Sequence, residues 1–138
     1  MNKLVILFSK RKVLWTIICI LLFLTVFLVL DWINTGIEIT KGDVIEISAE
    51  GKFVWKREGR ELCGPDGADV YSYSANKPMP GAPTGAMIAR IGTDSKESVL
   101  IGSHKTIVAF KSGSLYLGIN DDNTKDNDGE YRVWIKKQ

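Results

Sequence analysis

The sequence predicts an all-β fold, an antiparallel β-sandwich, with one transmembrane helix before it. Three observations support this prediction. The 138 residues are enough for one domain. Beyond residue 32, short apolar stretches rich in β-branched residues alternate with turn-forming Gly, Asp, Asn, Pro and Ser, without helical periodicity. Before that point, residues 13–30 form one long apolar run.

The strands are predicted from short apolar stretches separated by regular turn signals, a spacing that is typical of a sandwich. Val44–Ala49 shows the alternation most clearly, with Ile45, Ile47 and Ala49 on one face. Turns are predicted at residues 41–43 and at Glu50-Gly51. The eight predicted strands are Ile37–Ile39, Val44–Ala49, Lys52–Trp55, Ala86–Ile91, Ser98–Ile101, Thr106–Val108, Ser114–Ile119 and Glu130–Ile135.

The N-terminal helix is predicted from the run Val13–Leu30, which would be about 27 Å long at ~1.5 Å per residue. Lys10-Arg11-Lys12 precedes this run, so the positive-inside rule keeps the N-terminus in the cytoplasm. We therefore expect a single-pass membrane protein whose C-terminal domain is periplasmic or extracellular. The expected divisions are a short cytoplasmic segment at 1–12, a transmembrane signal anchor at 13–32 and an exported domain at 33–138.

Two other interpretations of the apolar run fit the sequence less well. A cleaved signal peptide would need a small-x-small site, whereas residues 27–32 are bulky throughout. A lipoprotein would need a small residue before Cys19, which Ile17-Ile18 does not provide. Trp15 and Trp32, near the two ends, are typical of the aromatic belts at membrane surfaces. An uncleaved signal anchor is therefore the favoured interpretation.

Charge and cysteine content exclude several classes of function. Four of the 18 basic residues and none of the 16 acidic residues lie in 1–30, so the exported part is mildly acidic. It has no basic stripe that would hold nucleic acid. Cys19 and Cys63 are too few, and too differently placed, for a disulfide framework or a Cys₂His₂ zinc site. Cys63 is predicted to be a partly buried small residue, with an intermolecular disulfide as the alternative.

Catalytic signatures are also missing from the sequence. It offers no His-supported nucleophile, no paired carboxylates in an evident cleft and no Gly-rich loop for phosphates, so we do not expect an enzyme. The one histidine, His104, is predicted to be a surface residue near a strand edge.

Two loops could carry function. Residues 56–85 fit no strand and hold all four prolines, which is typical both of binding loops and of variable surface loops. The loop Asn120–Gly129 is dense in the oxygen ligands that Ca²⁺ needs, yet Asp, Asn and Gly are also ordinary turn formers. Its spacing alone leaves a calcium site and a solvated turn equally open. The oxygen-bearing side chains are those of Asp121, Asp122, Asn123, Asp126, Asn127 and Asp128.

An ordered series of motifs resembles the PA-IL-like (LecA-type) calcium-dependent galactophilic lectins. Each motif alone is weakly specific, but their order and spacing together are specific, and the resemblance favours calcium over a solvated turn. The motifs are Asn34–Ile37, Lys41–Gly51, Cys63–Gly67, Pro80–Gly92, Ser112–Asn123 and Asp126–Gly129.

The resemblance implies a jelly-roll-type β-sandwich (galactose-binding-like) with Ca²⁺ at one end, where sugar hydroxyls bind the ion directly. Carried over by position, Asp121 would contact both the ion and the sugar. Asp126 and Asn127 match a pair of side-chain ligands near the end of the loop. Trp55 would supply a backbone carbonyl, and Asn123, or Thr124 beside it, would supply another, although the loop here is shorter than the family's.

The expected sugar contacts depart from the family pattern. The family's founding lectin uses a His and a Gln in the long loop, and residues 63–85 contain neither. Asp66, Asp69, Tyr71 or Tyr73 would have to serve instead. The predicted sugar-binding residues are Asp121, Asp126, Asn127, Asp69 and Tyr71.

The sequence therefore predicts a membrane-anchored, Ca²⁺-dependent carbohydrate-binding module, with galactose-type sugars as candidate ligands. The alternative is a Ca²⁺-stabilised structural or protein-interaction module of the cell envelope that binds no sugar, and the missing loop histidine favours it. The expected partners are a glycan or polysaccharide and, through the N-terminal helix, a membrane, with no nucleic acid. A single such site should bind weakly, so several copies on one membrane, or an oligomer, would act together.

Overall fold

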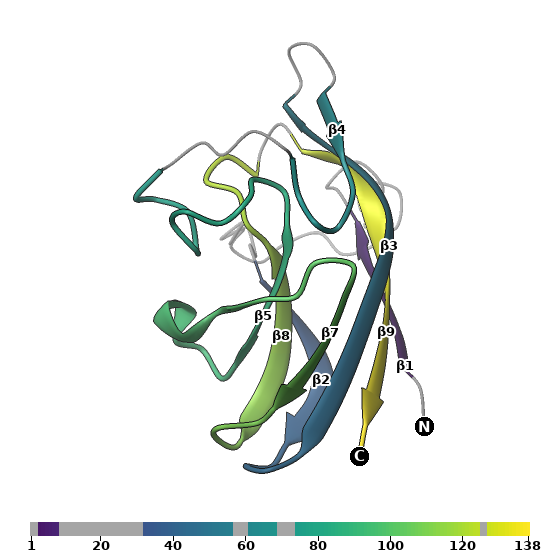
Figure 1. The fold of residues 1–138 in the computed structure, drawn as a ribbon, viewed down its shortest axis with the longest axis vertical. Helices are drawn as coiled ribbons and strands as arrows, with labels where there is room; N and C mark the ends of the chain where they lie inside the picture. Colours follow the sequence, from purple (N-terminus) through teal and green to yellow (C-terminus); the bar gives the residue numbers. More distant parts are fainter. Residues whose placement is uncertain (1–2, 9–31, 57–60, 69–73, 125–126) are drawn as a thin grey trace, which may run out of the picture.

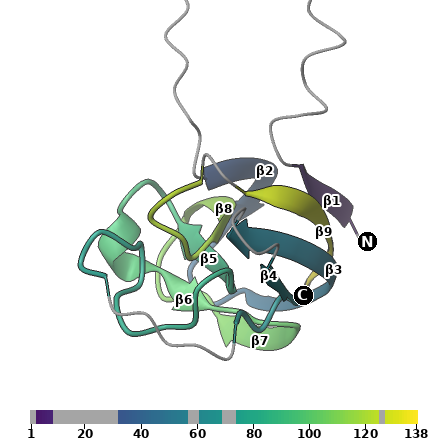
Figure 2. The same cartoon turned by 90° about the horizontal axis from the view of Figure 1, so that it is seen from above.

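The protein is described by a computed structural model, which covers residues 3–8, 32–56, 61–68, 74–124 and 127–138. Two antiparallel sheets pack face to face, as the sequence predicts (Figure 1). The larger sheet has the order β1-β9-β3-β4, with β7 also paired to β3, and the smaller has the order β2-β8-β5-β6. Figure 2 shows β1, β3 and β9 on one side of the sandwich and β5 and β6 on the other. The bounds are β1 Lys3–Phe8, β2 Trp32–Ile39, β3 Val44–Lys56, β4 Glu61–Cys63, β5 Met87–Ile91, β6 Val99–Leu100, β7 His104–Val108, β8 Gly113–Ile119, β9 Asp128–Lys137, and a 3-10 turn, η2, at Ser95–Glu97.

Strand β3 is one continuous strand, where the sequence predicted two strands and a turn at Glu50-Gly51. It pairs with β9 without a break from Ile45 to Val54. The turn prediction is wrong because Gly51 serves a different purpose. Its φ is +124°, and a Cβ there would run into the backbone carbonyl oxygen of Glu130 on β9. The glycine lets the two longest strands approach each other closely instead of reversing the chain.

The other edge of β3 is shared by two short strands. Its first half pairs with β7, and its last residues pair with β4, which the sequence did not predict. Strand β4 begins at Glu61, inside the loop 56–85 that seemed free of strands, and is only three residues long. The remaining predicted strands overlap observed ones, and along β9 the alternating apolar pattern matches the buried face of the sheet.

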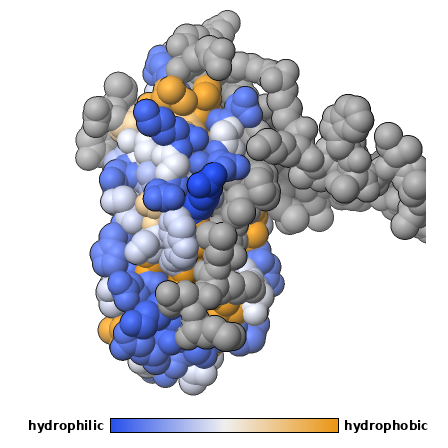
Figure 3. All heavy atoms as spheres, turned by 90° about the vertical axis from the view of Figure 1, so that its right-hand side faces the viewer, coloured by the Kyte–Doolittle hydropathy of each residue, from blue (hydrophilic) through white to orange (hydrophobic). Residues whose placement is uncertain are grey.

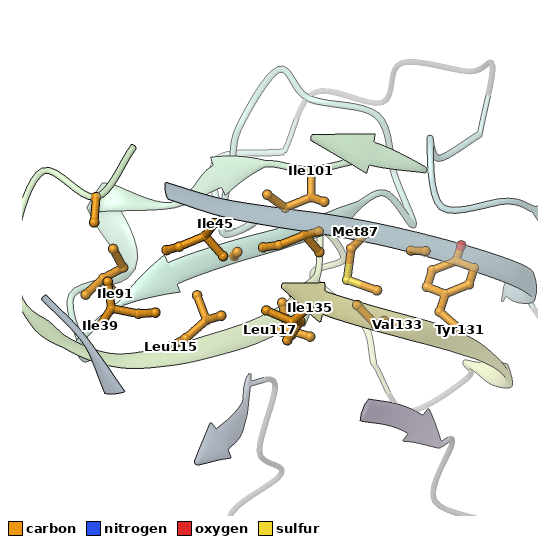
Figure 4. Close-up of a cluster of buried hydrophobic side chains, with 14 of the residues drawn as sticks. Ile39, Ile45, Met87, Ile91, Ile101, Leu115, Leu117, Tyr131, Val133 and Ile135 are labelled. Atoms are coloured by element: carbon orange, nitrogen blue, oxygen red, sulfur yellow. The ribbon is translucent and has the colours of Figure 1, made fainter. Parts of the chain in front are cut away.

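The core lies between the two sheets and is made of the alternating residues. Figure 4 shows side chains from β3, β5, β8 and β9 meeting there. Each large side chain that becomes fully buried in this way contributes roughly 1.5–3 kcal/mol to folding. The predicted inward face of β3 is confirmed. Its Ile45, Ile47 and Ala49 are buried together with Met87, Ile91, Leu115, Leu117, Tyr131, Val133 and Ile135.

The outward faces of β3 and β9 carry polar side chains. Glu50, Arg132 and Lys136 are exposed there, and Trp134 is the one large apolar side chain of these two strands that is exposed on this face. Figure 3 shows this side of the molecule as mostly hydrophilic, with small hydrophobic areas. The alternation of buried and exposed residues along β9 is what an antiparallel sheet with one solvated face requires.

At the N-terminus, residues Lys3–Phe8 form β1 and extend the larger sheet by pairing with β9. From the sequence, residues 1–12 are expected in the cytoplasm, apart from the exported domain, and Trp32 is expected in the anchor. In the structure, Trp32 begins β2. A strand and the sheet to which it pairs lie on the same side of a membrane, so this pairing and a single crossing at Val13–Leu30 exclude each other. Residues 13–30 lie outside the described residues. Among those that the structure describes, no helix is long and apolar enough to cross a membrane.

Candidate functional site

Three strand ends meet at the end of the sandwich that the sequence singled out. Because β3 and β9 are antiparallel, the C-terminal end of β3 lies beside the beginning of β9 (Figure 1). Val54 pairs with Asp128 in the last pair of the two strands. Trp55 follows Val54 and Asn127 precedes Asp128, so both residues lie at this end of the sandwich. The third strand is β8, which ends at Ile119 and leads directly into the acidic loop.

Asn120 fastens the long loop to the end of β8. Its side chain is fully buried, and its amide nitrogen donates to the carbonyl oxygens of Met79, Ala82 and Pro83 at 3.1 Å each. Its amide oxygen accepts the backbone N–H of Met79 at 2.9 Å. The backbone of Asn120 also pairs with Gly85 and Ala86. These bonds hold the loop 79–86 in one position beside the acidic loop.

This role of Asn120 was not predicted from the sequence, where the residue was grouped with the oxygen-rich loop. The available signal was its position as the first polar residue after the apolar run of β8. Gly85 supports the same junction, because a Cβ there would overlap the sulfur of Cys63 and approach the Cβ of Trp55. The long loop, β4 and the end of β3 are therefore in contact around Gly85.

Asp121 is nine-tenths buried at this junction, with only 6 % of its surface exposed. Its Oδ1 accepts the backbone N–H of Asn123 at 3.1 Å, and its own N–H donates to Ile119 at 2.9 Å, so the carboxylate is held in a local turn. The charge of Asp121 reaches Cys63. Burial is the main cause that raises the pKa of the Cys63 thiol, a hydrogen bond with Tyr131 opposes it, and the negative charge of Asp121 adds to the rise.

Asn127 presents a buried amide oxygen. Its Oδ1 has almost no exposed surface and makes no hydrogen bond within the described residues. A buried acceptor without a donor costs free energy, and amide oxygens are ligands that Ca²⁺ accepts. Trp55 and Asp121, two further assigned ligands that the structure describes, lie at the same end of the sandwich. The donor set contains only oxygen atoms, so these residues fit a hard cation.

Other residues of the predicted metal site contribute less in the structure. Asn123 is exposed, and its backbone is tied to Asp121. Asp126 lies outside the described residues. Among the residues that are described, no group of three or more His, Cys, Asp and Glu side chains forms a metal cluster.

A cavity of about 610 Å³ opens beside Asp121. Its wall comes from four separate parts of the chain, which are the start of β2, the long loop, η2 and the acidic loop. Lys77 is almost fully buried in this wall, and its ammonium group donates to Thr84. The lining residues are Trp32, Ala75, Asn76, Lys77, Pro78, Pro80, Lys96, Asp121 and Asp122.

The residues proposed to replace the missing sugar contacts are mostly not described. Asp69, Tyr71 and Tyr73 lie outside the described residues. Asp66 is described, and its Oδ1 accepts the backbone N–H of Ser103 at 2.7 Å, so it fixes the chain between β6 and β7.

The two other residues that the sequence singled out, His104 and Cys63, lie outside the cavity wall and the predicted metal site. His104 is exposed at the start of β7, as predicted, and bonds to Ser48 at 2.9 Å. Cys63 is a buried, free thiol, which agrees with the prediction of a buried small residue.

Comparison with known proteins supports the resemblance that the motifs indicated. A scan against known protein families and a search of curated proteins find no match. Among solved structures, the chain matches the N-terminal domain of EclA, described as a PllA-like lectin, with a TM-score of 0.62 and 26% sequence identity. The match covers 78% of this chain and 87% of that one. In its fold, the chain is therefore similar to the PA-IL-like lectins, as its sequence predicts.

Proposed function

We propose that the protein is a Ca²⁺-dependent carbohydrate-binding module. Its lectin-like fold supports binding of a sugar and not catalysis. Asp121 carries the proposal, because one side chain joins the two features that such a module needs. It is a buried carboxylate at the end of the sandwich where Trp55 and Asn127 also lie, and it lines a cavity of about 610 Å³. That volume lies within the roughly 300–1,000 Å³ that is typical of ligand pockets.

The cation would be held by Asp121, Asp126 and Asn127, with backbone carbonyls of Trp55 and of Asn123 or Thr124. When bound, Ca²⁺ supplies coordination positions for two neighbouring sugar hydroxyls. The chain itself does the positioning. Asn120 fixes the long loop beside Asp121, and the buried Lys77 is held by Thr84, so the cavity wall needs little ordering when a ligand enters.

A second function remains in competition, that of a Ca²⁺-stabilised structural or interaction module without sugar binding. Asp66 favours it, because this candidate sugar contact is already engaged by Ser103, and the long loop has neither the His nor the Gln of the founding lectin. Galactose-type sugars are therefore candidates that need a direct test.

Membrane anchoring is a separate part of the proposal. Its support is the apolar run Val13–Leu30 with three basic residues before it. Protease added to spheroplasts digests the exported domain if the run is a single-pass anchor, while an N-terminal tag stays protected. Digestion of both would instead favour the pairing of Lys3–Phe8 with β9.

Calcium binding is tested by thermal unfolding of the full chain in detergent micelles, with Ca²⁺ or with a chelator. A cation present at 100 times its Kd should stabilise the fold by about 2.7 kcal/mol. Asp121→Ala should abolish this gain, while Asp122→Asn, an exposed carboxylate of the same loop, should keep it. An Asp121→Ala protein that still gains stability from Ca²⁺ would show that the metal assignment is wrong.

Sugar binding is tested with a glycan array probed with and without Ca²⁺. Ca²⁺-dependent binding that is lost in Asp121→Ala supports the carbohydrate-binding module. A protein that is stabilised by Ca²⁺ but binds no glycan would favour the structural module instead.

A further inference from the structure

We propose that Trp32 and Lys96 form a second sugar subsite beside Asp121, so that the ligand is an oligosaccharide of at least two units. This inference rests on the proposed carbohydrate-binding function and deepens it. The first unit would lie at Asp121, and the next unit would lie against the Trp32 ring with Lys96 donating hydrogen bonds to it.

The cavity extends well beyond the predicted cation site. Its wall includes Asp121 and Asp122 from the loop after β8, but also Trp32 at the start of β2 and Lys96 from η2. Its volume of about 610 Å³ is in the range of pockets that enclose drug-sized ligands of several rings. A single sugar held only at Asp121 would leave the Trp32 and Lys96 walls without a ligand.

Trp32 packs against Arg90 at the cavity wall, which suits a stacking surface. The guanidinium of Arg90 lies 4.2 Å from the centre of the Trp32 ring and 5.3 Å from the ring of Tyr116. Trp32 pairs with Gly118 on β8, which has no side chain to compete for the same space. A ring fixed before binding loses little freedom when a ligand packs on it, and aromatic side chains with a few polar groups are typical of ligand pockets.

Arg90 is placed there at a cost to stability. Its Nε is buried and makes no hydrogen bond within the described residues. A buried donor without an acceptor is unfavourable unless another interaction compensates, and here the two aromatic rings supply cation–π contacts. Arg90 thus acts as a positioning residue that keeps Trp32 at the cavity wall.

Lys96 supplies the polar partner. It is exposed, and its backbone N–H donates to Asp94 at 2.9 Å, which fixes the turn η2. Among the described residues, its ammonium group has no ion-pair partner, whereas the ammonium of Lys77 is directed to Thr84. Three N–H donors on a flexible stem can reach the hydroxyls of a sugar that lies on Trp32.

The test compares monosaccharide and oligosaccharide binding by the full chain in detergent micelles with Ca²⁺. The probes are galactose, lactose and an array of longer glycans. The variants are Trp32→Ala and Lys96→Gln, and the matched control is Trp134→Ala, which removes an exposed tryptophan from the outward face of β9. Thermal unfolding of each variant checks the fold, and the exposed Lys96 can be changed without disturbing packing.

The wild type should bind an oligosaccharide at least about tenfold more tightly than its terminal monosaccharide, which corresponds to one stacking contact. Trp32→Ala and Lys96→Gln should each remove most of this preference and leave monosaccharide affinity unchanged, and Trp134→Ala should alter neither. Equal binding of both ligand sizes by the wild type, or an intact preference in both variants, would overturn the second subsite alone. A wild type that binds no glycan at all would overturn the proposed function and this inference with it.

Discussion

The middle of the sandwich and its Asp121 end are stabilised by different interactions. The middle is packed with aliphatic side chains and Tyr131 from both sheets (Figure 4). Among the described residues, the buried polar side chains are Thr35, Lys77, Thr84, Asn120 and Asp121, and all but Thr35 belong to the Asp121 end. A folded protein buries polar groups at a cost, so their concentration at one end indicates a site that stability alone does not require.

The largest expected effect comes from the middle. Leu117→Ala removes a fully buried side chain between the sheets and should lower the free energy of unfolding by about 2–5 kcal/mol. Chemical denaturation measures this change. The Ca²⁺-induced gain in stability should be the same as in the wild type, because Leu117 belongs to the apolar core between the sheets. If the Ca²⁺ gain disappeared as well, the two regions would not be separable.

The second-largest loss of stability is expected at the Asp121 end of the sandwich. Asn120→Ala removes the bonds to the carbonyl oxygens of Met79, Ala82 and Pro83 and to the N–H of Met79. The carbonyls of Met79 and Pro83 keep their backbone bonds, so the Ala82 carbonyl and the Met79 N–H lose their partners, each costing about 1–3 kcal/mol if water does not reach it. We expect a loss of about 3 kcal/mol in denaturation experiments, together with the loss of glycan binding, because the long loop is released.

Thr35→Val is the matched control for Asn120→Ala. It removes two hydrogen bonds of the Thr35 hydroxyl, one donated to the carbonyl of Leu115 and one accepted from the N–H of Ile37, at a part of the sandwich away from the acidic loop. It should lower stability and leave glycan binding intact. Equal binding by Asn120→Ala and the wild type would mean that the loop position does not determine the site.

The difference between the two regions also explains what the sequence could predict. Alternation along Ile45, Ile47 and Ala49 is a local pattern, so it predicted the core face of β3 correctly. The role of Gly51 depends on the carbonyl of Glu130 across the sheet, and no neighbouring residue reveals that contact. Asn120 was grouped with the oxygen-rich loop, because its hydrogen-bond partners lie about forty residues earlier in the chain. Asp121 and Asn127 were named from family motifs, and the structure places both at one end.

A smaller change in the free energy of unfolding is expected at Asn127, and it should show whether the buried amide oxygen serves the fold or a cation. Asn127→Leu replaces an acceptor that makes no hydrogen bond within the described residues, so without Ca²⁺ the unfolding free energy should stay equal or rise by about 1 kcal/mol. With Ca²⁺, the same variant should lose the gain that the wild type shows. Thermal unfolding with Ca²⁺ and with chelator measures both values. A variant that is destabilised equally in both conditions would mean that Asn127 supports the fold and not a cation.

The smallest effect is expected at the opposite end of the sandwich, where the turn between β2 and β3 also holds a carboxylate. Asp43 accepts the backbone N–H of Thr40 at 2.8 Å, and Lys137 lies 3.2 Å away. The Thr40 bond is the main cause that lowers the pKa of Asp43, Lys137 adds to it, and desolvation opposes both. Because the folded-state pKa is below the unfolded one, this stabilisation is present above the unfolded pKa and is lost as the pH falls through the folded pKa.

Asp43→Asn should therefore lower the melting temperature slightly at pH 7 and not at all at a pH below the folded pKa. The effect stays small because Asp43 is solvated, in contrast to the buried Asp121. Melting curves of the variant and the wild type across this pH range provide the measurement. A loss at pH 7 as large as that of Leu117→Ala would contradict the comparison, since a solvated turn would then stabilise the fold as much as the core does.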